Sequence, residues 1–390
     1  MAVIWFEGFE NGAASPSSVS DNYQDVNGAV SIQNTVKRSG EFALRINPSG
    51  ATNDFVGFAR NGADGVYRGY SNLFNLATLY VRFYFQYATA PASNHEPIFE
   101  PWSMVGTKKG SLRLDSTFHL RLYDSADVNR SVSAGTLAAN TWYCIEQIWN
   151  TGSSALVEIY VDGVLFTTGT FDTRTSNHGN IYIGRPSNAF GNAVDYYYDD
   201  LVLEDAVLPG PGSVIRLDCN ANTAIAGWSG GTNSSDFNEV DEIPSDGDTT
   251  YIETSSTNAS VFDLETIVAA GGPASATVAA VRAQAVVKRT TGNASTIKAR
   301  LDFSGSTVES SGVTPTNGTY KEFDHLVLVR PNDSAPWNYA DIASVAVGVS
   351  DAATSSAVRC TAVRAYVDLR HSGSGGGGGG KSGLFLLGVG

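Results

Sequence analysis

Carboxylates are the side chains of this sequence that are the first candidates for catalysis. Hydrolysis of a glycosidic bond needs two carboxyl groups that face each other across the sugar. Glu146 and Glu158 each stand alone on a predicted strand, and the 5 histidines lie in separate segments with no nucleophile beside them. The pattern predicts a protein that is not an enzyme. Polysaccharide hydrolysis stays open only through an arrangement that the sequence does not display.

Two acidic stretches are candidates for calcium, which takes several oxygen ligands at once. They are the pair Asp199-Asp200 and the loop from Asp236 to Asp248. Neighbouring residues of a strand point to opposite faces, so the pair reaches one ion only if the strand bulges. The loop spacing differs from Asp-x-Asp-x-Asp-Gly. We therefore expect no cofactor, with calcium as the alternative.

Residues 375–382 read Gly-Gly-Gly-Gly-Gly-Gly-Lys-Ser and satisfy the phosphate-binding pattern G-x-x-x-x-G-K-S. Such a loop works between a strand and a helix whose N-terminal amides point at the phosphates. No α/β unit precedes this stretch, and a low-complexity linker matches the pattern by composition alone. We expect no nucleotide site.

Aromatic residues in loop-like stretches are candidates for stacking against sugar rings. They are Trp102, Tyr67, Tyr70, Phe190 and Trp228. Aromatic side chains of β-sandwiches lie more often in the core, which is the competing interpretation.

The elements that must position these residues are strands. Residues 157–161 and 164–166 flank Asp162-Gly163, and an Asp-Gly pair between β-branched runs predicts a tight β-hairpin. The run from Leu79 to Tyr87 is apolar and aromatic on both faces, which predicts a central strand. The period of two continues along the chain and favours an all-β fold of two β-sandwich (jelly-roll) domains.

Four segments in a fixed order carry a resemblance to a known fold. Trp142-Tyr143, then VEIYVDGVL, IYIGR and YYYDDLVLED, resemble the closing strands of the concanavalin-A-like (laminin-G-like) lectin and glucanase jelly roll. The resemblance implies that residues 1–207 form such a jelly roll. The glucanase branch carries its carboxylates as Glu-x-Asp-x-x-Glu, and this chain has no such run.

A second domain is predicted beyond the break at Pro209-Gly210-Pro211-Gly212, where two prolines cannot continue a ladder. We take 208–212 as a linker and 213–371 as a second β-sandwich. The acidic stretch 239–252, the run AVRAQAVVKR and Trp337 before a strand resemble β-sandwich domains of tailed-bacteriophage structural proteins.

Composition narrows the classes of function. With 25 Lys and Arg against 39 Asp and Glu, the formal net charge is −14, which argues against a nucleic-acid partner. The 3 cysteines, Cys144, Cys219 and Cys360, are far apart and are expected to be buried thiols. No run has the length of a membrane span, and residues 1–12 do not read as a secretory signal.

The segment 372–390 joins a glycine-rich tether to an apolar peptide. We expect that peptide to dock on neighbouring subunits of an assembly. The docking residues would be Leu384, Phe385, Leu386, Leu387 and Val389. The sequence thus predicts a bacteriophage virion protein, for capsid decoration or a fibre, made in the host cytoplasm and bound to other virion proteins as a homo-oligomer. The alternatives are an adhesin that binds host surface glycans and, third, an extracellular polysaccharide hydrolase.

Overall fold

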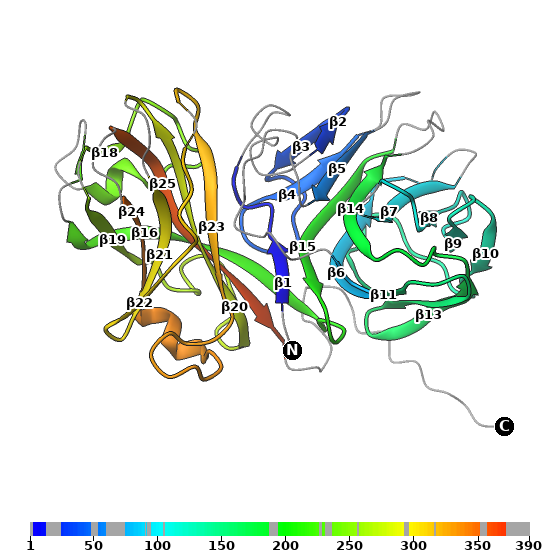
Figure 1. Ribbon diagram of the computed structural model, residues 1–390. Coiled ribbons are helices and arrows are strands. Elements are labelled where there is room, and N and C mark those ends of the chain that lie inside the picture. The colour runs from blue at the N-terminus through cyan, green and yellow to red at the C-terminus, as the bar shows by residue number, and fades with distance from the viewer. Residues whose placement is uncertain are drawn as a thin grey trace.

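The computed structural model consists almost entirely of β-strands (Figure 1), which confirms the predicted all-β class. It describes all residues except 1–2, 13–24, 48–53, 60–74, 90, 92–94, 104–105, 187–193, 226–227, 231–235, 256, 292–295, 316, 352–356 and 372–390. Strands β1 to β15 form two stacked sheets, and strands β16 to β25 form a ten-stranded sheet that folds onto itself.

The first layer is an eight-stranded sheet in the order β13-β12-β11-β6-β15-β4-β3, with β1 paired to β15. Its strands are β1 (Val3–Glu7), β3 (Val30–Gln33), β4 (Ala43–Ile46), β6 (Thr78–Tyr87), β11 (Tyr143–Asn150), β12 (Ala155–Val161), β13 (Val164–Phe171) and β15 (Tyr196–Glu204). Strand β6 lies in the middle and is buried on both faces along most of its length, as its sequence predicts.

The second layer is a seven-stranded sheet in the order β10-β9-β8-β7-β14-β5-β2. Its strands are β2 (Asp25–Asn27), β5 (Asp54–Ala59), β7 (Glu96–Ser103), β8 (Gly110–Leu114), β9 (Leu120–Asp124), β10 (Asn129–Val132) and β14 (His178–Arg185). The core between the layers is aliphatic and aromatic, with Phe83, Phe99 and Trp149 fully buried.

The β12–β13 hairpin forms at the predicted turn. Asp162 and Gly163 have φ angles of 51° and 80°, the left-handed values that a two-residue turn of this hairpin type requires. Val157, Ile159 and Val161 point into the core, so the alternation fixes which face of the hairpin is buried.

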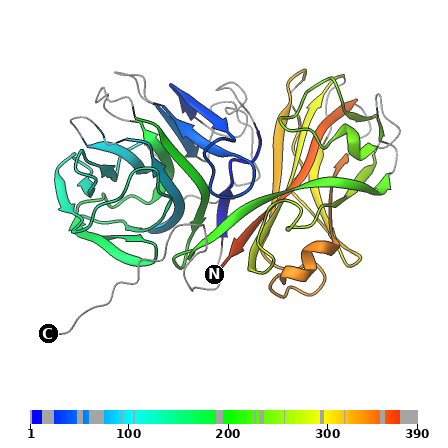
Figure 2. The same cartoon turned by 180° about the vertical axis from the view of Figure 1, so that it is seen from behind.

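The remaining strands build the second sandwich. They are β16 (Gly212–Ile225), β17 (Ser229–Gly230), β18 (Ile252–Thr254), β19 (Ala259–Leu264), β20 (Thr277–Arg289), β21 (Ile297–Phe303), β22 (Ser306–Glu309), β23 (Lys321–Val327), β24 (Val345–Asp351) and β25 (Val358–Arg370), with 3₁₀ helices η1 (Asp236–Glu239) and η2 (Tyr339–Ser344). The first half of β16 pairs with β25 and the second half with β19. A single strand therefore runs through both layers, as Figure 2 shows from behind.

The two sandwiches meet along a buried junction. An apolar cluster joins β1 and β15 to the layer of β16, β20 and β25: Val3, Phe6, Val202, Val214, Ala280 and Tyr366. Ion pairs cross beside it, from Arg82 to Asp368 at 3.3 Å with both side chains fully buried, and from Glu7 to Arg282 at 3.2 Å. The polar side chains of β15 are buried as well, in this junction.

Cys144, Cys219 and Cys360 are buried and free, as expected. Among the described residues, no helix has the length and apolar character needed to cross a membrane.

Candidate functional site

An aromatic row lies on the outer face of the seven-stranded sheet. Phe55 on β5, Tyr182 on β14 and Trp102 on β7 alternate with core residues of the same strands. The Tyr182 ring lies 5.3 Å from that of Phe55 and 5.5 Å from that of Trp102, both in edge-to-face contact. Phe55 is buried, whereas Trp102 and Tyr182 are partly exposed. The row thus offers two aromatic surfaces on a supported base.

Glu100 lies within this row. It stands opposite Tyr182 in the β7–β14 ladder and accepts a hydrogen bond of 3.1 Å from the Trp102 indole nitrogen. Glu100 is fully buried, so its carboxylate fixes the orientation of the Trp102 ring from beneath. An aromatic ring held at a set angle is a suitable platform for a flat apolar ligand surface.

A histidine and a tyrosine are in contact on the same sheet as the aromatic row. His95, directly before β7, hydrogen-bonds through Nδ1 to the hydroxyl of Tyr123 on β9. The Arg113 guanidinium, on β8 between them, lies 4.0 Å from the centre of the Tyr123 ring. Asp127 pairs with Arg113 and with Lys108, so one carboxylate serves two cations.

The protonation states of this pair depend on their surroundings. Burial, followed by the nearby Arg121 cation, lowers the pKa of His95, and burial raises the pKa of Tyr123. At neutral pH the imidazole is therefore a base and the phenol an acid. A base and an acid in hydrogen-bond contact are the components of proton transfer to and from a bound molecule.

The sequence-based sugar-stacking candidates have different outcomes. Trp102 lies on the outer face, as a glycan contact requires. Trp228 is in the core of the second sandwich, and its indole nitrogen donates to the Asn258 carbonyl at 3.2 Å. Tyr67, Tyr70, Phe190, the phosphate-loop pattern 375–382 and the docking residues Leu384, Phe385, Leu386, Leu387 and Val389 lie outside the described residues.

The carboxylates considered for hydrolysis lie on the outer side of neighbouring strands, β11 and β12, and both lie near Tyr160. Glu146 lies on the other sheet, where it accepts a hydrogen bond of 2.7 Å from the Gly210 amide. Glu158 stands on β12, opposite Ile148. The sequence did not predict the pair of His95 and Tyr123, because contacts between β7, β8 and β9 depend on sheet order. The one available signal was that Arg121 and Tyr123 share a face of a predicted strand.

The strand at Asp199-Asp200 does bulge. The β15–β6 register shifts between Asp199 and Val202, and Asp200 has a φ of 52°. Both carboxylates consequently reach the same loop: Asp199 accepts from the Ser39 amide, and Asp200 from the Ser39 hydroxyl at 2.7 Å. Among the described residues, no three His, Cys, Asp or Glu side chains form a group that could hold a metal ion. Calcium binding stays a prediction.

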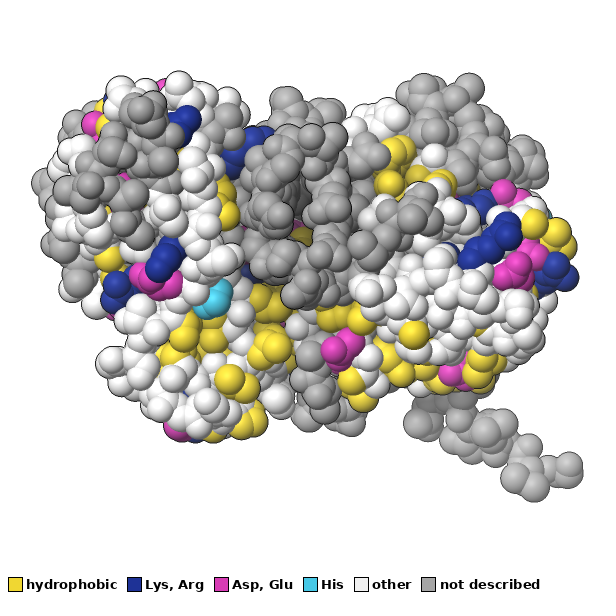
Figure 3. Space-filling view, in the orientation of Figure 1, with side chains coloured by type: hydrophobic (Ala, Val, Ile, Leu, Met, Phe, Trp, Pro, Cys, Tyr) yellow, Lys and Arg dark blue, Asp and Glu magenta, His cyan; other side chains and the backbone are white. Residues whose placement is uncertain are grey.

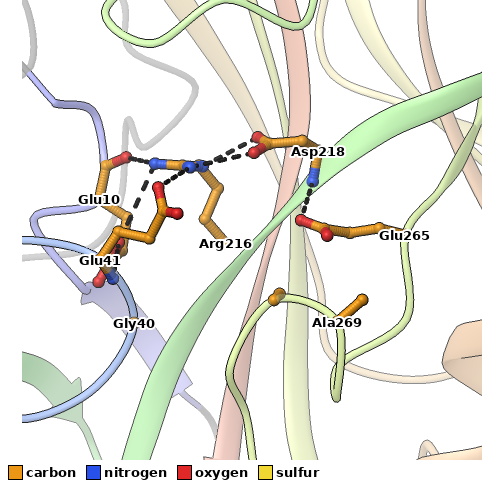
Figure 4. A pocket seen from close by; sticks show the side chains of 8 residues that line it. Glu10, Gly40, Glu41, Arg216, Asp218, Glu265 and Ala269 are labelled. Carbon is orange, nitrogen blue, oxygen red and sulfur yellow. Dashed lines mark hydrogen bonds and ion pairs between the residues drawn. The ribbon is translucent and has the colours of Figure 1, made fainter.

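A small polar cavity of about 110 Å³ lies at the junction (Figure 4). The Arg216 guanidinium reaches Glu41 and Asp218, each at 2.9 Å, and the Glu10 carbonyl. Glu265 accepts from the Asp218 amide at 3.2 Å. The polar groups that line the cavity thus bind one another across the two sandwiches, and we assign them to the junction.

Comparison with known proteins yields fold-level similarity. No protein-family model and no curated protein sequence matches the chain. Among solved structures, the chain is similar to "Cellulose induced protein, Cip1" (19% identity, TM-score 0.36, 48% of this chain and 91% of that chain). It is also similar to the alginate lyase Aly36B (13%, TM-score 0.37, 52% and 97%) and to a Trypanosoma rangeli sialidase (16%, TM-score 0.34, 48% and 30%). Likeness at these TM-scores carries no argument about ligands.

The comparisons bear on three of the sequence-based expectations. The prediction that the protein is not an enzyme is wrong as it stands, because the similar structures include an alginate lyase and sialidases. The resemblance to a concanavalin-like sandwich agrees with these β-rich, carbohydrate-related structures. The predicted virion role and the bacteriophage resemblance gain no support from them.

Proposed function

We propose that the outer face of the seven-stranded sheet binds a carbohydrate chain. The observation that carries this proposal is the supported pair of partly exposed rings, Trp102 and Tyr182, with Glu100 fixed beside them. Sugar rings present flat C–H faces that stack on aromatic rings, while their hydroxyls need polar partners. This proposal takes up the glycan-binding alternative of the sequence analysis.

The test is affinity electrophoresis of the whole chain in gels that contain one polysaccharide each, from a panel of neutral and uronate-containing polymers. We expect retardation by at least one polymer. Trp102→Ala and Tyr182→Ala should each weaken binding about tenfold or more, which corresponds to about 1.4 kcal/mol. Tyr160→Ala, on the other sheet, is the matched control and should bind as the unchanged chain does. Equal retardation of all four proteins, or of none, would contradict the proposal.

A second candidate, cleavage of the bound chain, is favoured by the contact between His95 and Tyr123. In this scheme neutral His95 takes a proton from the attacking water or from a sugar carbon. Tyr123 gives its phenolic proton to the departing glycosidic oxygen. The hydrogen bond between the two side chains then returns the proton from His95 to Tyr123, which restores the starting state.

Product analysis separates this candidate from binding alone. With a polymer that the chain retains, we expect new chain ends, together with ultraviolet absorbance if the cleavage is an elimination that leaves a double bond. Tyr123→Phe keeps the ring beneath Arg113 and removes the proton donor, so it should abolish cleavage and preserve binding. Binding without cleavage would sink this candidate and leave the carbohydrate-binding proposal intact.

A further inference from the structure

The outer face of the eight-stranded sheet is covered over only part of its width. On β6 and β15, Arg82 and Glu204 are buried against the second sandwich. On the outer side of the β12–β13 hairpin, the exposed fractions of Leu156 and Leu165 are 43% and 48%. In Figure 3 the surface over β13 shows mainly hydrophobic and uncharged side chains. We call this uncovered part, formed by β11, β12 and β13, the open face.

The open face has apolar side chains on each of its strands, with the carboxylates Glu146 and Glu158 between them. Tyr160 on β12 pairs with Leu165 on β13, and Ile148 on β11 lies next to Tyr80 on β6. These side chains alternate with the core residues of their strands, so they share the outer side of the sheet. Strand β13 is at the end of the described sheet order, where its only partner is β12. The open face therefore combines apolar side chains with an edge strand.

The second sandwich ends beside the open face. Arg370, the last residue of β25, pairs with Glu204 at 2.7 Å. The next residue, His371, donates its amide to the Pro211 carbonyl at 2.9 Å. The neighbouring Gly210 amide is bound to Glu146 on β11, and Glu146 stands opposite Tyr160. The chain after His371 thus starts close to β11, one strand away from Tyr160.

The length of the tether after His371 fits this span. Strands β11 and β13 are two spacings apart, which is roughly 10 Å. A glycine-rich segment of roughly 12 residues, as in 372–383, has a root-mean-square length of about 17–21 Å. The linker is longer than the span, and the effective concentration then falls only as about the −3/2 power of linker length, from the millimolar range of short flexible linkers. Docking within the chain is therefore favoured over docking on another copy.

We propose that the open face is the docking surface of this chain's own apolar peptide, residues 384–389. The peptide places Leu384, Phe385, Leu386 and Leu387 in succession. It packs on Leu156, Tyr160 and Leu165, beside the edge of β13. This inference replaces the neighbouring subunit of the sequence analysis with the same chain as acceptor, and it does not depend on the proposed carbohydrate site.

The experiment is hydrogen–deuterium exchange of the full chain, read by mass spectrometry for peptides from β12 and β13, with light scattering of the same samples. The unchanged chain should be monomeric, and β13 amides should exchange at least about fivefold more slowly than in the Phe385→Asp, Leu387→Asp double variant. Val268→Asp, a 57% exposed position of the second sandwich, is the control that should leave this protection unchanged.

A surface variant tests the acceptor side. Leu165→Asp in the full chain should give the same fast exchange in β13 as the double variant, with circular dichroism unchanged. The tail sequence is intact in that protein, so the effect reports the open face itself. Equal exchange in the unchanged chain and the double variant would overturn the proposal. Protection that appears only with a doubled mass would overturn the assignment to the same chain.

Discussion

Burial of His178 should make the stability of the first sandwich depend on pH. The histidine is fully buried on β14, and its Nε2 lies 2.9 Å from the Trp149 carbonyl. Burial, and then the charge of Lys109, lowers the pKa of His178 from 6.5 to about 3. The folded protein therefore holds a neutral imidazole in conditions where the unfolded chain already binds a proton.

The sign and size of the effect come from this difference. The stabilising contribution of His178 is complete above pH 6.5, where neither state is protonated, and is lost as the pH falls towards about 3. A difference of about 3.5 pH units corresponds to roughly 4–5 kcal/mol in total. The free energy of unfolding of the first sandwich should thus fall by up to about 1.4 kcal/mol per pH unit through this one group.

The perturbation is His178→Gln, which keeps a donor for the Trp149 carbonyl and cannot take up a proton. Guanidinium unfolding, followed by both fluorescence and circular dichroism at pH 7.5, 6, 5 and 4, gives the free energy for each protein. We expect the free energy of unfolding of the variant to fall less steeply between pH 6 and pH 4, by the slope that corresponds to uptake of about one proton. His119→Gln, at a partly exposed turn of the same sandwich, is the control. Parallel curves for His178→Gln and the unchanged chain would refute the reasoning.

Three further predictions concern the junction, a glycine and a turn. Arg82→Met removes the fully buried one of the two cations that pair with Asp368, while Arg370 remains, and should cost about 3 kcal/mol of unfolding free energy. Adding Asp368→Leu should recover part of that loss, and denaturant titration of the single and double variants decides. Gly184→Ala should lower the melting temperature by several degrees in calorimetry, because the glycine has a φ of 90° and an added Cβ would lie 2.6 Å from the Asp54 carbonyl oxygen. Hydrogen bonds with the His119 and Thr117 amides and with Arg121 lower the pKa of Asp115 to about 2. Asp115→Asn should therefore cost about 1–3 kcal/mol of unfolding free energy at pH 7 and less at pH 2. Equal losses at both pH values would contradict this.

Local pattern was sufficient to predict most strands. The hairpin at Asp162-Gly163 and the central strand β6 are as expected, because turn chemistry and alternation act over a few neighbouring residues. The short strands β17 and β22 had no sequence signal of their own. Strand β16 continues past its apolar first half to Ile225, because pairing with β19 holds its polar second half in the sheet.

Only one residue of the candidate site, Trp102, was predicted from the sequence. Trp102 stood out as an aromatic residue in a loop-like stretch, although it is on β7. Its neighbour Tyr182 and the contact between His95 and Tyr123 arise from pairings between strands far apart in sequence. A single sequence does not specify which of many strands become neighbours. The bulge at Asp200 was likewise invisible, because a φ of 52° at a non-glycine residue is held by the surrounding junction.

The buried junction also determines whether the chain can be divided. The stretch Pro209–Gly212 resembles a domain linker. Removal of residues 213–371 would nevertheless expose Phe6 and Val202 to solvent and leave Arg82 without Asp368. Each half has an apolar surface that the other half covers in the intact chain. Either half expressed alone should therefore aggregate and be poorly soluble. The two sandwiches should therefore fold as one unit, and exchange of either half between proteins would have to carry its junction along.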